Sequence, residues 1–378
     1  MSFCSHFDIG ECRSCGWMDL SYAEQLQRKE RQLHEALDPF HPEEWKKPVV
    51  SPVRGFRNKA KMVASPSPEG IVLGLGESMS LVSCPLYDAE IQNALESVQT
   101  WLQELGIKAY DVVRKKGELK YVLLTRSTYK GALMLRFVLR SGGAIPRLQK
   151  GLNDLRGRIP ALRVISANIQ PVHMAILEGE EEIFFSEERQ LEERLNGISL
   201  YIRPKSFFQT NPEVASKLYK TASEWIGDAK TVWDLFCGVG GFALHCMKEG
   251  RSITGIEIEQ EAIECARESA RSIGKGELTF ESLDAATFTA MSQEKPGVVI
   301  VNPPRRGLGE AMCRWLSKIA PNTILYSSCN PETLSRDSAY LQEYTLKRVQ
   351  SFDMFPHTGH YEVLCLFERK FAPSQTQS

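Results

Sequence analysis

Two residues able to do covalent chemistry follow or begin apolar segments near the end of the chain. Cys329 lies in Ser-Ser-Cys-Asn-Pro, directly after the apolar run 323–327, and Glu362 begins the last apolar run. A cysteine just before a helix start can be a nucleophile, because the helix N-terminus lowers the pKa of its thiol. A carboxylate at the same edge of the fold can remove a proton. We therefore predict that Cys329 and Glu362 are catalytic; the alternative is that Cys329 is a structural cysteine.

A second group of residues predicts a ligand site. The apolar run 231–236 contains Asp234 and leads into Gly238, Gly240 and Gly241, which allow a sharp turn and a close approach of the backbone to a ligand. Taken alone, this turn suits a dinucleotide site or a plain tight turn. Asp234 precedes the glycines, where it can meet an ammonium group, and Asn302-Pro-Pro-Arg follows another apolar run. This combination resembles S-adenosylmethionine (SAM) methyltransferases more than dehydrogenases.

The elements that must position these residues alternate along the C-terminal half. Predicted strands and helices alternate from residue 231 to residue 369, which indicates a doubly wound, Rossmann-like α/β sheet with an antiparallel end. Ligands bind such sheets at the carboxyl ends of the strands. Glu257 ends the second strand, where an acid can bind ribose hydroxyls, and Asp284 ends the third, near the expected adenine. Glu362 reaches the same edge if the last strand is antiparallel.

The rest of the chain predicts further parts with different compositions. We expect a smaller α+β RNA-binding domain before the methyltransferase domain and a metal-binding segment at the N-terminus. The expected parts are an N-terminal segment at 1–47, a basic hairpin at 48–82, the central α+β domain at 83–195, the methyltransferase domain at 196–372 and a disordered tail at 373–378.

Four cysteines could form a metal site. Cys4, Cys12 and Cys15 crowd a short polar segment, and Cys84 stands before a proline. Four thiolates on loops suit zinc or an iron–sulfur cluster, and four unrelated cysteines are the alternative. The chain has ten cysteines and no secretion signal, which favours reduced thiols and a cytoplasmic protein. No apolar run approaches the roughly 18 residues that span a bilayer, so we expect no membrane association.

The charge distribution predicts a local nucleic-acid surface. The formal net charge is only -1, yet residues 110–150 contain ten Lys or Arg against Asp111 and Glu118. Such a local excess is typical of a polyanion-binding surface, although an ordinary charged sheet face would have the same composition. We expect Lys115, Lys116 and Lys120 to contact RNA phosphates.

The catalytic pair and a methyl donor together suit one reaction. Pyrimidine C5 is a poor nucleophile, but a thiolate that adds to C6 makes C5 an enolate carbon able to accept a methyl group. A base must then remove the C5 proton so that the thiol can leave. Cys329 and Glu362 fit these two roles, with Arg305 or Asn302 able to orient the pyrimidine.

Several stretches make a family resemblance specific. The chain resembles the RNA uracil-C5 methyltransferase family over the whole C-terminal half, and the N-terminal cysteines extend the likeness to the full chain. The motifs are Phe-Phe-Gln-Thr-Asn at 207–211, Asp-Leu-Phe-Cys-Gly-Val-Gly-Gly-Phe at 234–242, Asn-Pro-Pro-Arg at 302–305, Ser-Ser-Cys-Asn-Pro at 327–331 and His-Thr-Gly-His-Tyr-Glu at 357–362.

The resemblance implies more than the residues alone. It implies a [4Fe-4S] cluster on the four N-terminal cysteines, a uracil of 23S rRNA as substrate, and a hairpin at 49–77 that packs back onto the catalytic domain. No obligate protein partner is implied. Asn302 stands where many relatives carry Asp. The implied SAM contacts are Gln209, Phe236, Glu257, Asn302 and Gly241, the last without a side chain.

Three other functions remain open on the sequence. The chain could methylate a different uracil in 23S rRNA or tRNA. Asn302-Pro-Pro also occurs in enzymes that methylate exocyclic amines, although an aromatic residue usually follows it there. A non-catalytic iron–sulfur protein that binds RNA is the third alternative. Cys329 separates them, because only C5 methylation requires a nucleophilic cysteine.

Overall fold

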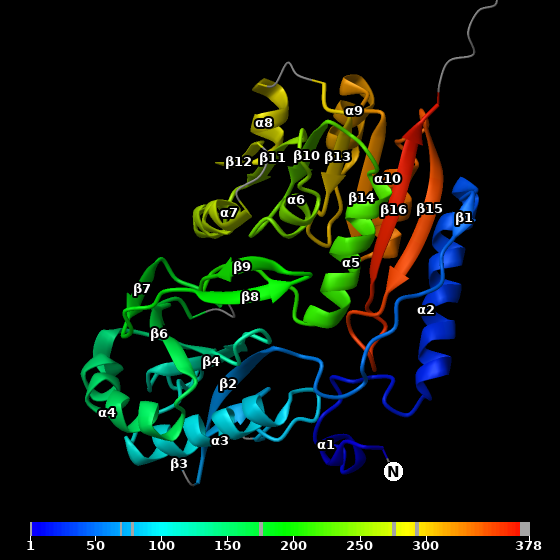
Figure 1. Cartoon of the computed structure of the whole chain (residues 1–378). Helices are drawn as coiled ribbons and strands as arrows, with labels where there is room; N and C mark the ends of the chain where they lie inside the picture. Colours follow the sequence, from blue (N-terminus) through cyan, green and yellow to red (C-terminus); the bar gives the residue numbers. More distant parts are fainter. Residues whose placement is uncertain are drawn as a thin grey trace, which may run out of the picture. The chain divides into compact units, whose positions relative to one another are not determined.

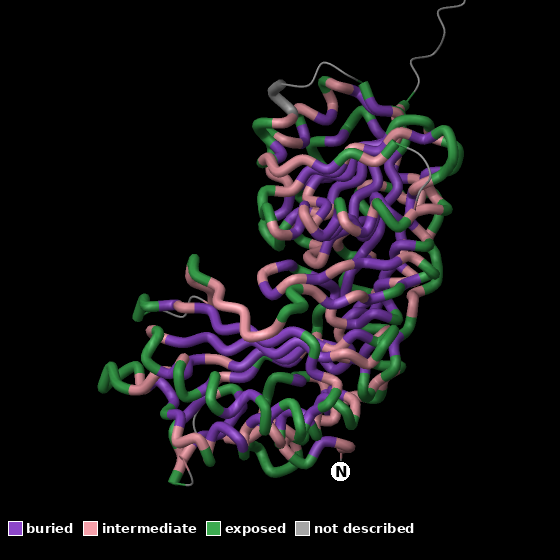
Figure 2. Tube along the Cα trace, turned by 60° about the vertical axis from the view of Figure 1, so that its left-hand side comes forward, coloured by how far each residue is buried: buried purple, intermediate pink, exposed green. Residues whose placement is uncertain are grey.

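The computed structural model describes residues 2–68, 70–76, 79–173, 177–273, 277–291 and 295–370, and the chain forms two compact units. The first comprises Met1–Cys15, Pro52–Arg194 and Tyr201–Pro212; the second comprises Gly16–Ser51, Leu195–Leu200 and Glu213–Ser378. Figure 1 shows their elements, and Figure 2 shows a buried interior in each. The predicted tail at 373–378 lies outside the described residues.

The second unit contains an eight-stranded sheet in the order β1-β15-β16-β14-β13-β10-β11-β12. Strands β10 to β14 are parallel, and β16 runs antiparallel to both β14 and β15. The predicted Rossmann-like sheet with an antiparallel end is therefore confirmed. The strands are β1 (Glu44–Trp45), β10 (Thr231–Leu235), β11 (Ser252–Glu257), β12 (Glu277–Ser282), β13 (Val298–Val301), β14 (Thr323–Ser328), β15 (Tyr344–Phe352) and β16 (Glu362–Arg369).

The central strands are apolar on both sides because helices cover both faces of the sheet. All four residues of β13 are buried. Helices α2, α9 and α10 share one core cluster with the sheet, whereas α6 and α7 contact β10, β11 and β12. The helices of this unit are α2 (Tyr22–Leu37), η1 (Asp38–Phe40), α5 (Pro212–Trp225), α6 (Gly241–His245), α7 (Gln260–Ile273), α8 (Ala285–Met291), α9 (Glu310–Ile319) and α10 (Pro331–Ser338).

The N-terminal segment is divided differently from the expected 1–47. Helix α2 starts with a capping box between Ser21 and Glu24, and it buries Leu33 and Leu37 in the core of the eight-stranded sheet. Its Lys29 forms a buried ion pair with Asp353, 2.6 Å between Nζ and Oδ1. Residues 16–51 thus belong to the second unit, while the first three cysteines belong to the first unit.

The first unit is an α+β fold around a six-stranded sheet in the order β3-β2-β4-β5-β6-β7. Only β5 and β6 are parallel to each other, and α4 lies between them in sequence. Helices α3 and α4 share a core cluster with the sheet. The elements are α1 (Ser5–Asp8), β2 (Lys59–Ser67), β3 (Gly70–Gly74), α3 (Ala89–Glu104), β4 (Leu119–Arg126), β5 (Leu133–Leu139), η2 (Gly142–Ala144), α4 (Ile145–Arg158), β6 (Leu162–Ile169) and β7 (Glu181–Phe184).

The predicted basic hairpin at 48–82 is part of this sheet, not a separate part of the chain. Strand β2 pairs with β4, and β3 forms the edge. Ala60, Met62 and Ala64 alternate along β2 and are buried in the core of the first unit. This apolar alternation, and not the basic side chains between, decides where the hairpin belongs.

A short hairpin carries the chain between the two units. Strands β8 (Leu191–Leu195) and β9 (Ile198–Ile202) pair with each other alone. In the described part of the chain, no helix combines the length and apolarity needed to cross a membrane.

Candidate active site

Cys329 lies at the carboxyl end of β14, directly before the residue that caps α10. Asn330 is the cap, and its Oδ1 accepts a hydrogen bond from the backbone N–H of Glu332 at 3.0 Å. The side chain of Cys329 is half-buried and is in no disulfide. The strand end and the helix start therefore present this thiol at the ligand edge of the sheet, as predicted.

Glu362 begins β16, and the antiparallel pairing brings it to the same edge. Ser328 of β14 pairs with Val363, so Glu362 lies beyond the last residue of β14. Its carboxylate is fully enclosed and accepts a hydrogen bond from the hydroxyl of Ser327, 2.7 Å between Oγ and Oε1. Burial raises the pKa of Glu362 to about 7, and the Ser327 hydrogen bond opposes that rise. A carboxylate with this pKa suits proton transfer near neutral pH.

The pKa of the Cys329 thiol is raised, whereas the sequence predicted that a helix start would lower it. Its pKa is raised, first by burial and then by the negative charge of Glu362. The charge of Arg305 and its hydrogen bond to the thiol act in the opposite direction. The helix start therefore does not lower the pKa of Cys329 below its ordinary value, because desolvation and a neighbouring carboxylate outweigh it. Arg305 is the group that stabilises the thiolate.

The loop that carries Arg305 is attached to α10. Asp337 is fully buried and accepts hydrogen bonds from the N–H of Leu308 at 2.6 Å and from the hydroxyl of Tyr326 at 2.8 Å. Thr333 donates a hydrogen bond to the carbonyl of Arg305 at 3.2 Å. Because α10 starts just after Cys329, these bonds fix Arg305 relative to the thiol.

The glycine turn after β10 has the backbone of a ligand cradle. Phe236 has a φ of +64°, which is rare for a bulky residue and marks a strained position. Gly238 has a φ of +54°, and a Cβ there would meet no atom within 4 Å. By contrast, a Cβ on Gly241 would lie 2.5 Å from the ring of Tyr219, so this glycine is required for packing.

Two acids flank the turn. Asp234 is completely buried; its Oδ2 accepts from the N–H of Ala243 at 2.9 Å, whereas its Oδ1 has no partner among the described residues. Burial raises its pKa to about 8. Glu257 ends β11, and its Oε2 accepts from the N–H of Gly238 at 3.1 Å. The unpaired oxygen of Asp234 is what a ligand ammonium would satisfy.

The remaining predicted site residues lie in three different segments of the chain. Asn302 follows β13, with its N–H 3.4 Å from the carbonyl of Leu235. Gln209 is buried in the first unit, in the segment between β9 and α5. Asp284 caps α8 instead: its Oδ1 accepts from the N–H of Ala286 at 2.9 Å and of Thr287 at 3.1 Å.

The four N-terminal cysteines approach one another in the first unit, and none is in a disulfide. Burial raises the pKa of Cys15 to about 12, with contributions from Cys84, Cys12 and Cys4 in that order. The pKa of Cys84 is raised to about 11, mainly by burial. Across the described residues, however, no three or more His, Cys, Asp or Glu side chains are arranged closely enough to hold a metal ion.

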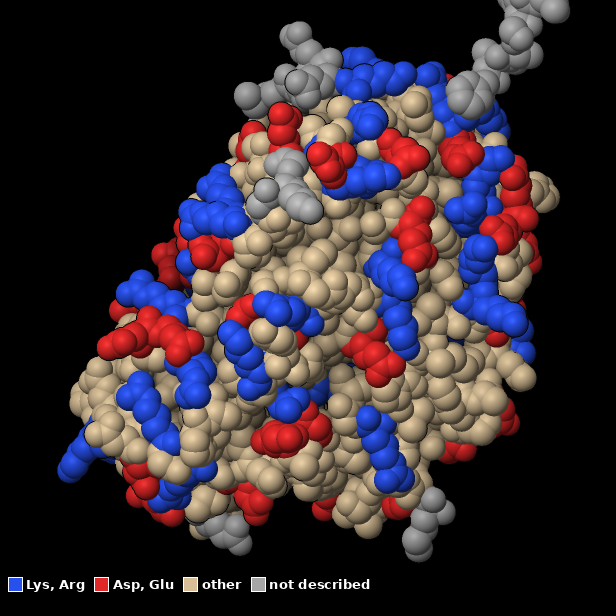
Figure 3. Space-filling model, in the orientation of Figure 1, with Lys and Arg blue, Asp and Glu red and all other residues tan. Residues whose placement is uncertain are grey.

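Half of the ten basic residues at 110–150 form ion pairs with acids, and Lys120 is buried. Lys120 is buried, with its Nζ 2.7 Å from the carbonyls of Gln170 and Val172, so its predicted RNA contact is wrong. Arg136 is buried and paired with Glu182 at 2.6 Å. Figure 3 shows acidic and basic side chains interspersed over the face in view. Further members pair with nearby acids: Arg126 with Asp88, Lys130 with Glu192, and Arg140 with Glu118.

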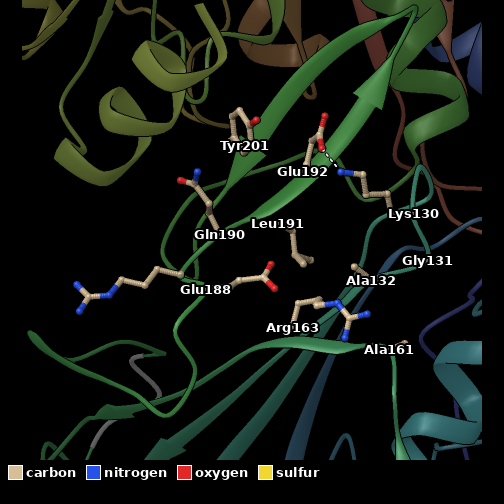
Figure 4. Close-up of a pocket in the computed structure, with 11 residues that line it drawn as sticks. Lys130, Gly131, Ala132, Ala161, Arg163, Glu188, Gln190, Leu191, Glu192 and Tyr201 are labelled. Carbon is tan, nitrogen blue, oxygen red and sulfur yellow. Dashed lines mark hydrogen bonds and ion pairs between the residues drawn. The ribbon is translucent and has the colours of Figure 1, made fainter. Parts of the chain in front are cut away.

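A cavity of about 470 Å³ lies in the first unit, apart from the predicted site residues (Figure 4). Glu188 and Arg163 face its interior in the close-up, and Lys130 and Glu192 pair at 2.5 Å on its wall. Its lining mixes both charges and includes neither a thiol nor any residue of the catalytic pair. The chemistry therefore belongs to the edge with Cys329, not to this cavity.

Known proteins similar to the chain agree with this site. Residues 180–370 match the family described as tRNA (Uracil-5-)-methyltransferase. The 23S rRNA (uracil(747)-C(5))-methyltransferase RlmC of Photorhabdus laumondii is 50% identical over 369 residues, which cover 96% of this chain and 98% of that protein. The protein of the same name from Shewanella amazonensis is 51% identical over 377 residues, with 98% of each chain covered.

A solved structure extends the agreement to three dimensions. The Pyrococcus abyssi tRNA (uracil-54, C5)-methyltransferase, solved in complex with S-adenosyl-L-homocysteine, superposes with a TM-score of 0.80 at 27% identity. The match covers 93% of this chain and 85% of that one. The fold is accordingly that of an α/β SAM-dependent methyltransferase. Given the matched family, the near-complete relatives and the edge that joins a thiol to a buried carboxylate, this chain belongs to the uracil-C5 methyltransferase family.

Proposed function

We propose that the chain methylates C5 of one uracil in 23S rRNA with SAM as methyl donor. The observation that carries this proposal is the arrangement at the sheet edge, where strand pairing brings Glu362 to the level of Cys329 and both Glu362 and Arg305 act on the pKa of that thiol. The names of the relatives support 23S rRNA as the substrate. An exocyclic-amine methyltransferase would need neither the thiol nor the buried base.

The chain's own residues account for each bond change. The Cys329 thiolate, stabilised by Arg305, forms a C–S bond to uracil C6, and the electron pair of the C5–C6 double bond moves into an enolate. Bound SAM supplies the methyl group that C5 then accepts. Glu362 takes the C5 proton, the double bond re-forms, and the C–S bond breaks to restore the thiolate. The pKa of about 7 lets Glu362 accept this proton and release it to water.

The structure fits SAM at the glycine turn. The open space at Gly238 leaves room for a ligand, and the unpaired Oδ1 of Asp234 suits its ammonium group. Glu257 would bind the ribose, with Phe236, Asn302 and Gln209 as further contacts. Gly241 contributes through its backbone only.

The direct test maps the product. Purified protein, SAM and a 23S rRNA transcript should yield 5-methyluridine at a single position, located by nuclease digestion and mass spectrometry. Cys329→Ala should yield none. Methylation of an exocyclic amine, or of tRNA in place of the 23S transcript, would contradict the proposal.

We further propose that Cys4, Cys12, Cys15 and Cys84 hold a [4Fe-4S] cluster. The donor set is chemically suitable, because none of the four thiols is in a disulfide and Cys84, Cys12 and Cys4 each act on the pKa of Cys15. Anaerobically purified protein should be brown and contain iron and sulfide in equal amounts, and Cys84→Ser should lose both. Colourless protein with stoichiometric zinc would contradict the cluster.

A further inference from the structure

A loop in the first unit exposes two apolar side chains at its tip. Val113 is 92% exposed and Val112 is 63% exposed. Turn tips normally carry glycine, asparagine, aspartate or serine, which tolerate water and tight backbone angles. Two adjacent valines that contact solvent are of no use to the fold, so they point to a partner.

Hydrogen bonds hold this tip in one conformation. The N–H of Asp111 donates to the carbonyl of Lys116 at 2.8 Å, and the N–H of Arg114 donates to Oδ1 of Asp111 at 2.9 Å. A Cβ on Gly117 would lie 1.9 Å from the carbonyl oxygen of Ala109, so the two sides of the loop touch. A loop already ordered in this way loses little entropy when it binds.

The charge around the valines indicates what the partner is. Lys115 and Lys116 are exposed, and their side chains have no ion-pair partner in the described part of the chain. Elsewhere in the basic region, Arg126, Lys130 and Arg136 are neutralised by acids. Val113, the most exposed large apolar side chain among the described residues, therefore lies beside two exposed cations that no acid neutralises.

We infer that the loop from Asp111 to Lys116 binds unpaired bases of the RNA substrate, with Val112 and Val113 against base faces and Lys115 and Lys116 on phosphates. Apolar side chains insert between bases in other nucleic-acid complexes. The unstacked bases of RNA loops expose faces to such side chains, and neighbouring cations neutralise the phosphates. This inference rests on the proposed RNA substrate. It assigns the recognition of single-stranded RNA to a surface distinct from the catalytic edge.

Binding without SAM tests the inference separately from methylation. The probes are a labelled RNA stem–loop with an unpaired uridine-rich loop and a blunt duplex of the same stem, measured by fluorescence anisotropy at several salt concentrations. The double variant Val112→Ser/Val113→Ser should bind the stem–loop about tenfold more weakly, with an unchanged salt slope and unchanged duplex affinity. Val50→Ser, at 48% exposure in the second unit, is the matched control and should bind as the wild type does.

Two results would overturn the inference. One is wild-type affinity of the valine variant for the stem–loop, which would show that another class of partner, such as a protein, covers the tip. The other is an equal loss on the stem–loop and the duplex, which would show that unpaired bases are not contacted. Failure of the proposed function looks different: the wild type would then not methylate 23S rRNA, while the difference between valine variant and control would persist.

Discussion

The catalytic edge of the second unit and the loop at 111–116 of the first unit use charge in opposite ways. At the edge, Glu362 is buried and Cys329 half-buried, so burial raises the pKa of both groups and the charges of Glu362 and Arg305 act on the pKa of Cys329. In the loop, the side chains of Lys115 and Lys116 are exposed to solvent. Electrostatic interactions are strong at low dielectric and screened by solvent and salt. Substitutions at the edge should therefore have large, pH-dependent effects, and substitutions in the loop small, salt-dependent ones.

The largest expected effect separates the nucleophile from the base. Glu362→Gln keeps the size and the Ser327 partner but cannot accept the C5 proton, so methylated RNA should remain attached to Cys329. A slowly migrating band on a denaturing gel measures this adduct. Cys329→Ala should give neither band nor product.

A substrate analogue provides the control for that comparison. RNA that contains 5-fluorouracil should trap the wild-type enzyme in the same way, because fluorine cannot leave as a cation. If Glu362→Gln turned over normally, the base would be another group, with the exposed loop residue His360 or a water as the next candidate. Active enzyme that formed no adduct with the fluorinated RNA would rule out addition of Cys329.

The next effect concerns the thiol itself. Arg305→Gln removes the charge and hydrogen bond that stabilise the thiolate, so the pKa of Cys329 should rise and its alkylation by iodoacetamide at neutral pH should slow about tenfold. Glu362→Gln should speed alkylation, because a negative neighbour is lost. Mass spectrometry of the Cys329 peptide measures both rates.

Arg306→Gln is the control for this experiment. Arg306 is the next residue and is also exposed, but it does not act on the pKa of Cys329. Equal slowing in both arginine variants would mean that general surface charge, and not a specific contact, tunes the thiol.

A smaller effect concerns pH. Glu362 must be ionised to accept a proton, and its pKa of about 7 means that this step should speed up as pH rises through 7. Ser327→Ala removes a donor that favours the carboxylate, so the rising part of the pH profile should move up by about one pH unit. Single-turnover rates from pH 5 to 9 measure the shift. A uniform loss of rate with no shift would indicate a structural role for Ser327 alone.

The smallest effect is expected in the loop. Lys115→Gln and Lys116→Gln should each weaken RNA binding and reduce the slope of log affinity against log salt by roughly 0.7. SAM affinity should not change. Lys120→Gln serves as a contrast: this lysine is buried, so its replacement should lower stability, measured by thermal unfolding, without flattening the slope. A flattened slope for Lys120→Gln but not for the exposed lysines would reverse the assignment.

Local patterns were sufficient for much of the fold. The alternation of strands and helices expected between residues 231 and 369 is present, and Glu257 ends the second of these strands, β11, as expected, because strands and helices differ in the period of their apolar residues. The placement of Glu362 beside Cys329 followed from assuming an antiparallel last strand, which the pairing of β14 with β16 supports.

Sequence patterns did not predict the burial of a charged side chain where its partner is distant in the sequence. Helix α2 is mostly polar, yet its Lys29 is buried. Asp353, more than three hundred residues away in the sequence, accepts a hydrogen bond from the Lys29 ammonium group and balances its charge. The same holds for Lys120. The sequence predicted that this lysine contacts RNA, but it is buried and donates hydrogen bonds to the carbonyls of residues 170 and 172.

The sequence by itself determined the family, the order of strands and helices, and the residues able to add to a pyrimidine and remove its proton, since these depend on residue type and near spacing. Only the tertiary structure decided the state of those groups. It raised the pKa of Cys329 through burial and through Glu362, placed Arg305 where its charge favours the thiolate, gave Ser327 a hydrogen bond to the base and paired five of the ten basic residues at 110–150 with acids. Burial and ion pairing are properties of neighbours in space, and the fold chooses those neighbours from distant parts of the chain.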